Sequence, residues 1–182
     1  MKNLILILTI LLSLTGCSRS LNLNQGIVKS SQPVFIETKP TDKKTYVKFT
    51  NTSSVDSNLT ASIKQYLAKS GYEIVGDEKL ANIVIKGNLD YFRRREFYSY
   101  EPYYYSFWGR RYYYDDFYRD REYFYDAGVS LLLRVEDEEE KTNLTFQHSR
   151  TLYSFGAITE ILNYQIYKRI LGYLGEDLDE KL

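Results

Sequence analysis

The segment Tyr91–Tyr125 limits what this chain can fold into more than any other stretch. Of its 35 residues, 18 are aromatic, seven are arginine and six are acidic, and none is Val, Ile, Leu, Met or Ala. Such a segment has no aliphatic face around which to close a core, yet it carries large rings whose surface water disfavours. We therefore expect this segment to contact whatever the protein binds.

The middle of this segment is nearly symmetric and predicts a hairpin. Two tyrosine triplets, 103–105 and 112–114, flank the stretch Phe107-Trp108-Gly109-Arg110-Arg111. A glycine between two strand-forming runs favours a tight turn, so we expect an extended hairpin that turns at residues 108–109. The residues predicted to contact a membrane or ligand are Tyr103, Tyr104, Tyr105, Trp108, Arg110, Arg111, Tyr112, Tyr113 and Tyr114.

Several roles fit this composition, and the sequence leaves them open. A low-complexity loop would keep its charges solvated. A membrane-interface or oligomer-lining element would place Tyr and Trp at the headgroup level, with Arg reaching lipid phosphates or lipopolysaccharide. A glycan-binding surface would stack its rings on sugars, with peptidoglycan or surface polysaccharide as candidate ligands. Single-stranded nucleic acid also suits arginines and stacking rings, but export of the chain argues against that partner.

The first 17 residues have the form of a lipoprotein export signal. Lys2 precedes an apolar run too short to span a membrane, and Leu14-Thr15-Gly16-Cys17 follows. These four residues resemble the bacterial lipobox, which implies cleavage after residue 16 and lipidation of Cys17 with acyl chains such as palmitate. Two or more acyl chains anchor a protein stably. By resemblance to known sorting rules, Ser18 favours the outer membrane, with the domain on its periplasmic or surface face.

The length and net charge of the chain limit the number of domains and the kinds of partner that it can have. Residues 17–182 suffice for one domain, and loss of Lys2 from 24 basic and 24 acidic residues leaves a formal charge of −1. A near-neutral chain gives no electrostatic reason for nucleic acid binding. Cys17 is the only cysteine, so no internal disulfide is expected. The expected layout is a signal peptide 1–16, a lipidated tether 17–32 and a domain 33–182 with an insertion 91–125.

Hydrophobic periodicity predicts the elements of that domain. Strands are expected at 33–37, 45–50, 72–75 and 82–89, followed beyond the insertion by a hairpin of 127–136 and 142–153 around an exposed acidic turn 137–141. A helix is predicted to begin after Asp56 or Ser57 and to end at Gly71, and a second spans Ile158 to Leu174. This order predicts an α+β fold: an antiparallel or mixed sheet with two amphipathic helices and a Tyr/Arg-rich insertion.

No residue pattern points to catalysis, a cofactor or a metal. His148 is the only histidine, so a zinc site is not expected, and a half-exposed place in a strand is predicted for it. The serines 53, 54 and 57 lack an accompanying base and are interpreted as loop and cap residues. The acidic run 137–140 lacks the ligand spacing of a calcium loop. We therefore expect a protein that is not an enzyme.

Part of the chain resembles a known family. Asn22-Leu23, Ile36-Glu37, the stretch TYVKFTNTS at 45–53, a helix that closes with KSGYEIV at 69–75, and Asp77 to Lys86 are similar to the TraT lipoproteins of surface exclusion and complement resistance. The resemblance implies a homo-oligomeric outer-membrane lipoprotein without catalytic residues. In the insertion, this chain has Tyr and Arg where the family has a long apolar Gly/Ala-rich stretch.

Two functions follow as hypotheses. The first is a TraT-like oligomeric envelope component, anchored in the membrane through Cys17. The second is an envelope-assembly or glycan-binding accessory lipoprotein that uses the Tyr-rich segment, with lipopolysaccharide, peptidoglycan or an envelope machine as its partner.

Overall fold

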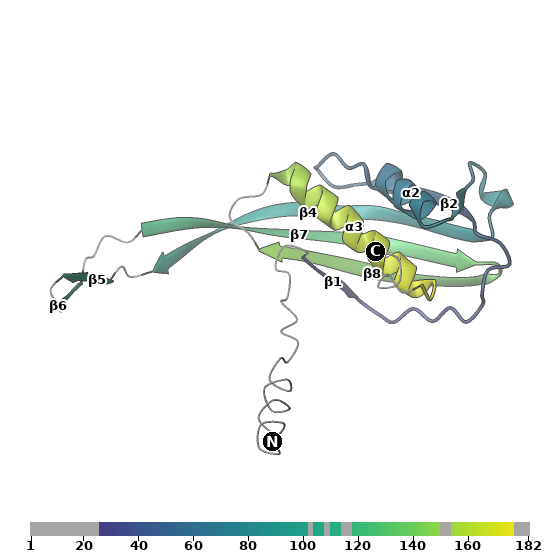
Figure 1. Cartoon of the computed structure of the whole chain (residues 1–182). Coiled ribbons are helices and arrows are strands. Elements are labelled where there is room, and N and C mark those ends of the chain that lie inside the picture. The colour runs from purple at the N-terminus through teal and green to yellow at the C-terminus, as the bar shows by residue number, and fades with distance from the viewer. Residues whose placement is uncertain (1–25, 102–103, 108–109, 114–117, 150–153, 177–182) are drawn as a thin grey trace, which may run out of the picture.

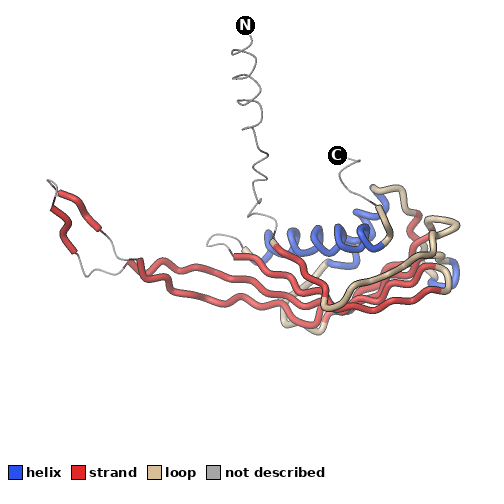
Figure 2. Tube along the Cα trace, turned by 90° about the horizontal axis from the view of Figure 1, so that it is seen from below, coloured by secondary structure: helices blue, strands red, loops and turns tan. Residues whose placement is uncertain are grey.

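A mixed six-stranded sheet carries both helices on one face (Figures 1 and 2). The computed structural model describes residues 26–101, 104–107, 110–113, 118–149 and 154–176, with the backbone alone for those among 97–122. The strand order across the sheet is β1-β8-β7-β4-β2-β3. Strand β2 runs parallel to β3 and β4, and the other neighbours are antiparallel. The predicted α+β fold with a mixed sheet is confirmed.

The helices and strands occur in the predicted order along the chain. The strands of the main sheet are β1 (Ile27–Ser30), β2 (Lys44–Asn51), β3 (Glu73–Ile74), β4 (Ile83–Glu101), β7 (Tyr118–Val135) and β8 (Glu138–Ser149). The helices are α2 (Leu59–Lys69) and α3 (Phe155–Tyr173), with a short 3₁₀ helix η1 (Glu78–Leu80) before β4. A second, two-stranded sheet consists of β5 (Tyr104–Phe107) and β6 (Arg110–Tyr113).

The helix ends follow local rules, with one correction. Gly71 has φ +86° and lies just beyond α2, as the sequence predicts for a helix that ends at a glycine. The N-cap of α2 is Asn58, not Asp56 or Ser57. Ser57 still contributes, because its hydroxyl accepts the backbone N–H of Leu59 at 3.2 Å. Helix α3 has Ser154 as its N-cap, and that side chain accepts from Ala157.

The core lies between the helices and the sheet. Ile63 and Leu67 of α2 and Ile158, Leu162 and Ile166 of α3 are fully buried against it. A polar contact links the two helices: the Asn163 amide donates to Asn58 Oδ1 at 2.8 Å and to Ser62 Oγ at 3.0 Å. The helical periodicity therefore marks the core-facing positions correctly.

The first strand lies earlier than predicted. Residues 33–37 form no strand, whereas Ile27–Ser30, which we assigned to the tether, pairs antiparallel with residues 144–147 of β8. Pro33 has no N–H to donate to a ladder. Val28 and the Phe146 side chain on β8 are both buried, and they join this edge strand to the core.

Of the run 137–141, predicted as an exposed acidic turn, only Asp137 lies in the turn, and residues 138–141 belong to a strand. Strand β8 begins at Glu138, which pairs with Val135, so that only Glu136 and Asp137 connect β7 and β8. Glu136 has φ 52°, the left-handed conformation of a tight hairpin turn.

Within the ranges that the structure describes, no helix is both long and apolar enough to cross a membrane.

Candidate functional site

The Tyr/Arg-rich segment leaves the sheet as a continuation of two of its strands. Strands β4 and β7 stay paired as far as Glu101 and Tyr118, whereas β2 ends opposite Leu89 and β8 ends opposite Phe124. We call residues 91–95 and 124–128 the root, and residues 96–101 and 118–123 the arm. Figure 2 shows the two strands running out beyond their neighbours. The segment is thus built as an extension of the sheet.

The root is fixed to the core by three aromatic rings. Phe92 and Tyr125 are buried on the helix side of the sheet, and Phe155 at the start of α3 lies against both. The Phe155 ring centroid lies 5.4 Å from that of Phe92 and 5.5 Å from that of Tyr125, each in an edge-on arrangement. Such pairs contribute about 0.5–1.5 kcal/mol each beyond their buried area. The two ends of the predicted insertion therefore belong to the core.

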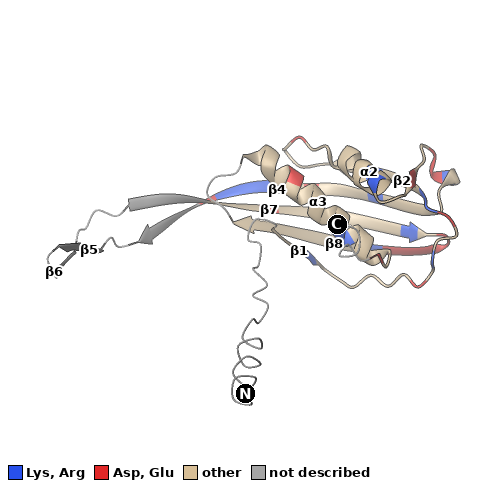
Figure 3. Ribbon diagram, viewed as in Figure 1, with Lys and Arg blue, Asp and Glu red and all other residues tan. Residues whose placement is uncertain are grey.

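The three consecutive arginines of the root each have a defined contact. The Arg94 guanidinium lies 4.7 Å from the Tyr123 ring centroid and 5.4 Å from that of Phe155. The Arg93 guanidinium lies 4.3 Å from the ring centroid of Tyr91. Cation–π contacts of this kind orient a guanidinium without neutralising it. Figure 3 shows the resulting basic band on β4 where the strand leaves the sheet.

Arg95 forms an ion pair with a carboxylate that is almost fully buried. Its Nε lies 3.2 Å from Asp126 Oδ1, and one of its terminal nitrogens donates to Oδ2 at 3.3 Å. Asp126 is 6% exposed, and burial of a carboxylate is costly unless it is paired. The ion pair joins β4 and β7 at the point where the sheet narrows.

A bulge turns β4 where it enters the root, and two glycines make room for aromatic rings beside it. The pairing of β4 with β7 shifts register between Leu89 and Tyr91. Gly128 lies beneath the Tyr91 ring, and Gly87 lies beneath the Phe49 ring, in places where a Cβ would overlap those rings. Bulges bend and twist the strand that carries them. The bulge therefore turns β4 as it enters the root.

The structure brings most of the predicted contact residues into one hairpin. Tyr104 and Tyr105 of β5 pair with Tyr113 and Tyr112 of β6, and Phe107 pairs with Arg110. The predicted antiparallel pairing about positions 108–109 is confirmed. Arg111 also belongs to β6, whereas Cys17, Tyr103, Trp108 and Tyr114 lie outside the described residues.

The remaining candidate positions have structural roles. His148 is 2% exposed on β8 and its ring stacks on Phe146 at 6.3 Å, so the prediction of a half-exposed histidine is wrong. It faces the core because it pairs with buried Tyr125. The Ser53 hydroxyl donates to Asn51 Oδ1 at 2.7 Å within its loop. Among the described residues, no three metal-ligating side chains come together.

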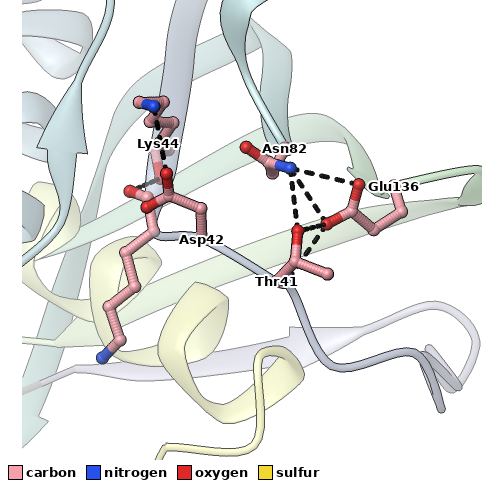
Figure 4. Close-up of polar contacts among 7 residues, drawn as sticks. Thr41, Asp42, Lys44, Asn82 and Glu136 are labelled. Carbon is pink, nitrogen blue, oxygen red and sulfur yellow. Dashed lines mark hydrogen bonds and ion pairs between the residues drawn. The ribbon is translucent and has the colours of Figure 1, made fainter.

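At the opposite end of the sheet, two glutamates hold the segment 37–41 in place. Glu138 accepts the backbone N–H of Thr38 at 3.0 Å, and Glu136 accepts both the backbone N–H and the hydroxyl of Thr41. Figure 4 shows Thr41 and Asn82 converging on Glu136. The backbone N–H of Thr41 lowers the pKa of Glu136, and that of Thr38 lowers the pKa of Glu138. Sequence reasoning missed these bonds because they join residues 54 to 100 positions apart.

Further charged groups at this end are also paired within the domain. Hydrogen bonding to Asp42 raises the pKa of Lys44, which lies 3.1 Å from that carboxylate. The Tyr72 ring lies beneath Lys43, and burial raises the pKa of its hydroxyl, with Glu176 adding to the effect. Because these charged groups bond to other residues of the domain, we interpret their role as structural. The arm and its root are therefore the candidate contact element.

Comparison with known proteins finds a similarity to one family in the first part of the domain. Residues 25–106 match the family described as the enterobacterial TraT complement resistance protein. No curated protein matches the chain. The matched residues extend from the first strand through β4 and into the Tyr/Arg segment.

Solved structures show a weaker likeness. The PelC dodecamer from Paraburkholderia phytofirmans is 14% identical with a TM-score of 0.44, covering 84% of this chain and 99% of that chain. The rare lipoprotein B from Shewanella oneidensis is 14% identical with a TM-score of 0.39, covering 70% and 93%. At these TM-scores neither protein indicates what this chain binds or how it assembles.

Proposed function

We propose that this chain is a non-catalytic outer-membrane lipoprotein and a homo-oligomeric envelope component, and the match of residues 25–106 to the TraT family supports this proposal. Acylated Cys17 is its membrane anchor, and the arm is its contact element. The role named in the family description is complement resistance. For this chain, the proposal covers the location, the anchor and the assembly.

One observation carries the proposal: the β4–β7 ladder continues without interruption from the root to Glu101 and Tyr118. An isolated two-stranded ribbon is marginally stable in water. Here the rings of Phe92, Tyr125 and Phe155 and the Arg95–Asp126 ion pair fix the base of the ribbon to the core. The aromatic segment is therefore held away from the domain, where it can reach a membrane surface or a second copy.

Membrane fractionation of cells that express the whole chain tests the anchor. The wild type is expected in the outer-membrane fraction and to incorporate labelled palmitate, whereas Cys17→Ser loses both properties because no thiol accepts the lipid. Recovery of the wild type in the soluble fraction would overturn the anchor.

The assembly is tested on the detergent-extracted lipoprotein by light scattering coupled to size exclusion. A defined oligomer is expected for the wild type. A variant in which an Asn-Gly turn replaces residues 97–122 is expected to be monomeric, because it lacks the contact element. A monomeric wild type over a hundredfold range of concentration would contradict the proposed assembly. Retention of that monomer on peptidoglycan would favour an accessory, glycan-binding role.

A further inference from the structure

The sheet face opposite the helices carries two cross-strand rows of side chains. The strand registers place Lys48, Lys86, Leu132 and Lys141 side by side across β2, β4, β7 and β8. The next row on the same face places together only hydroxyl and amide side chains, which are Thr50, Asn88, Ser130 and Asn143. A row of three lysines and a leucine, which we call the lysine row, thus lies beside a neutral row of hydrogen-bonding groups. Strand periodicity alone does not bring these positions together.

The lysine row is unfavourable for folding by itself. Like charges at directly opposed positions on neighbouring strands destabilise a sheet, and Lys48 is the direct neighbour of Lys86. Glu78 lies 2.5 Å from Lys86, and Glu139 lies 3.1 Å from Lys141. Lys48 is exposed and ion-pairs with no carboxylate in the part of the chain that the structure describes. The row therefore retains an unmatched positive charge that an anionic ligand would stabilise.

Between the two rows the sheet surface is hollowed. A depression of about 360 Å³ is lined by Lys86, Lys141, Asn88, Ser130, Asn143 and Gln32, together with backbone and neighbouring side chains, and by no acidic residue. This volume lies within the range of small-ligand sites. At one side of the depression lie Lys86 and Lys141, each also ion-paired with a carboxylate outside the lining, and at the other side lie amide and hydroxyl groups. Lys48, which pairs with no carboxylate among the described residues, lies in the same row, next to Lys86.

The side chains of the neutral row are held in place by hydrogen bonds to one another and to neighbouring residues. Thr50 donates to Asn88 Oδ1 at 2.8 Å, and Asn88 donates to Thr52 at 2.8 Å. Ser130 donates to Asp90 at 2.7 Å. Side chains fixed in this way lose little further rotamer freedom when a ligand binds. Asn143, by contrast, is an exposed side chain at the rim.

From this arrangement we propose that the depression binds an acidic carbohydrate, a glycan with carboxylate or phosphate groups. The lysines bind the acidic groups, and the amide and hydroxyl row binds sugar hydroxyls, which both donate and accept hydrogen bonds. An extended acidic peptide would add to an edge of the sheet, where side chains already bond the backbone at Phe49 of β2 and at Val28 of β1. Thr60 bonds both the N–H and the C=O of Phe49, and Arg169 bonds the C=O of Val28 at 2.7 Å.

This site lies on the sheet and not on the arm. A negative test of the site would therefore leave the proposed anchor and assembly unaffected. The test uses the detergent-extracted lipoprotein and isothermal titration at low salt. The probe is tetragalacturonate; the comparison ligands are maltotetraose, tetraglutamate and inorganic phosphate. Binding of tetragalacturonate, with weaker or no binding of the other three, is expected. Equal or tighter binding of tetraglutamate or maltotetraose would overturn the assignment to an acidic carbohydrate.

Matched variants locate the site. The double variant Lys48→Gln/Lys141→Gln is expected to weaken tetragalacturonate binding about tenfold through lost charge contacts, and Asn143→Ala by about twofold to fivefold. Lys64→Gln, on helix α2 and thus on the opposite face, removes one lysine and is expected to leave affinity unchanged. Each variant is first checked for a wild-type circular dichroism spectrum. Undiminished binding by a folded double variant, or an equal loss in Lys64→Gln, would contradict this location.

Discussion

The Tyr91 ring lies directly over Gly128. A Cβ added to Gly128 would lie 2.9 Å from the Tyr91 Cδ1 atom and nearer still to Cε1. The Arg93 guanidinium lies 4.3 Å from the centroid of the same ring. The ring therefore packs against a glycine backbone and an arginine at the root of the arm. This contact depends on a residue without a side chain.

We predict that Gly128→Ala destabilises the protein by about 1–3 kcal/mol, because the new methyl group must displace the Tyr91 ring. Urea unfolding followed by circular dichroism measures the change. Gly76→Ala is the control, since a Cβ there meets no atom within 4 Å. If Tyr91→Ala in the Gly128→Ala background does not recover part of the loss, the ring is not the cause.

Removal of the arm is expected to have opposite results depending on where the cut is made. Replacing residues 97–122 by Asn-Gly joins Glu96 to Tyr123, which are register partners, and should leave a folded domain. Replacing residues 91–125 also removes the buried rings of Phe92 and Tyr125. Loss of one buried aromatic ring costs about 3–5 kcal/mol, so the longer deletion should unfold the domain. Circular dichroism and thermal melting of the two variants measure whether each is folded and how stable it is. Equal stability of both would contradict the role of the root.

The acidic side of the stability curve should depend on Glu136. Its pKa is lowered from 4.5 in the folded state, so the charged form contributes stability above about pH 4.5, and this contribution is lost as the pH falls through the lower folded pKa. Glu136→Gln should therefore be less stable than the wild type near neutral pH, with a difference that shrinks in acid. Urea midpoints measured from about pH 7 down to about pH 3 test this prediction. Asp137→Asn is the neighbouring control; a difference for Glu136→Gln that does not vary with pH would contradict the linkage.

Thr60 should protect the outer edge of β2. Its hydroxyl accepts the N–H of Phe49 at 3.0 Å and donates to the C=O of Phe49 at 3.1 Å. Thr60→Val preserves the shape but leaves both groups unpaired, and we expect a loss of about 1–3 kcal/mol. Thr60→Ser keeps the hydroxyl and should lose less. Denaturant unfolding of the two variants provides the comparison, and equal losses would show that packing of the Thr60 methyl group dominates.

The sequence predicted those features whose signals are local. The spacing of Leu59, Ile63 and Leu67 and the glycine at 71 predicted α2, and the pairing of β5 with β6 followed from the symmetric tyrosine triplets. The core roles of Phe92 and Tyr125 could have been inferred from the alternation Ile83, Ile85, Gly87, Leu89, had it been continued past a one-residue bulge. That bulge has no clear signature in the sequence.

Sequence alone determined the order of the elements, the faces of the two helices and the hairpin within the Tyr/Arg segment, because each depends on residues that are close in the chain. Tertiary structure decided the rest. It paired residues 138–141 with β7 as part of a strand, buried His148 opposite Tyr125, and placed Lys48, Lys86 and Lys141 in one row. These outcomes depend on strand register between distant segments, and a shift of one residue would turn every side chain to the other face.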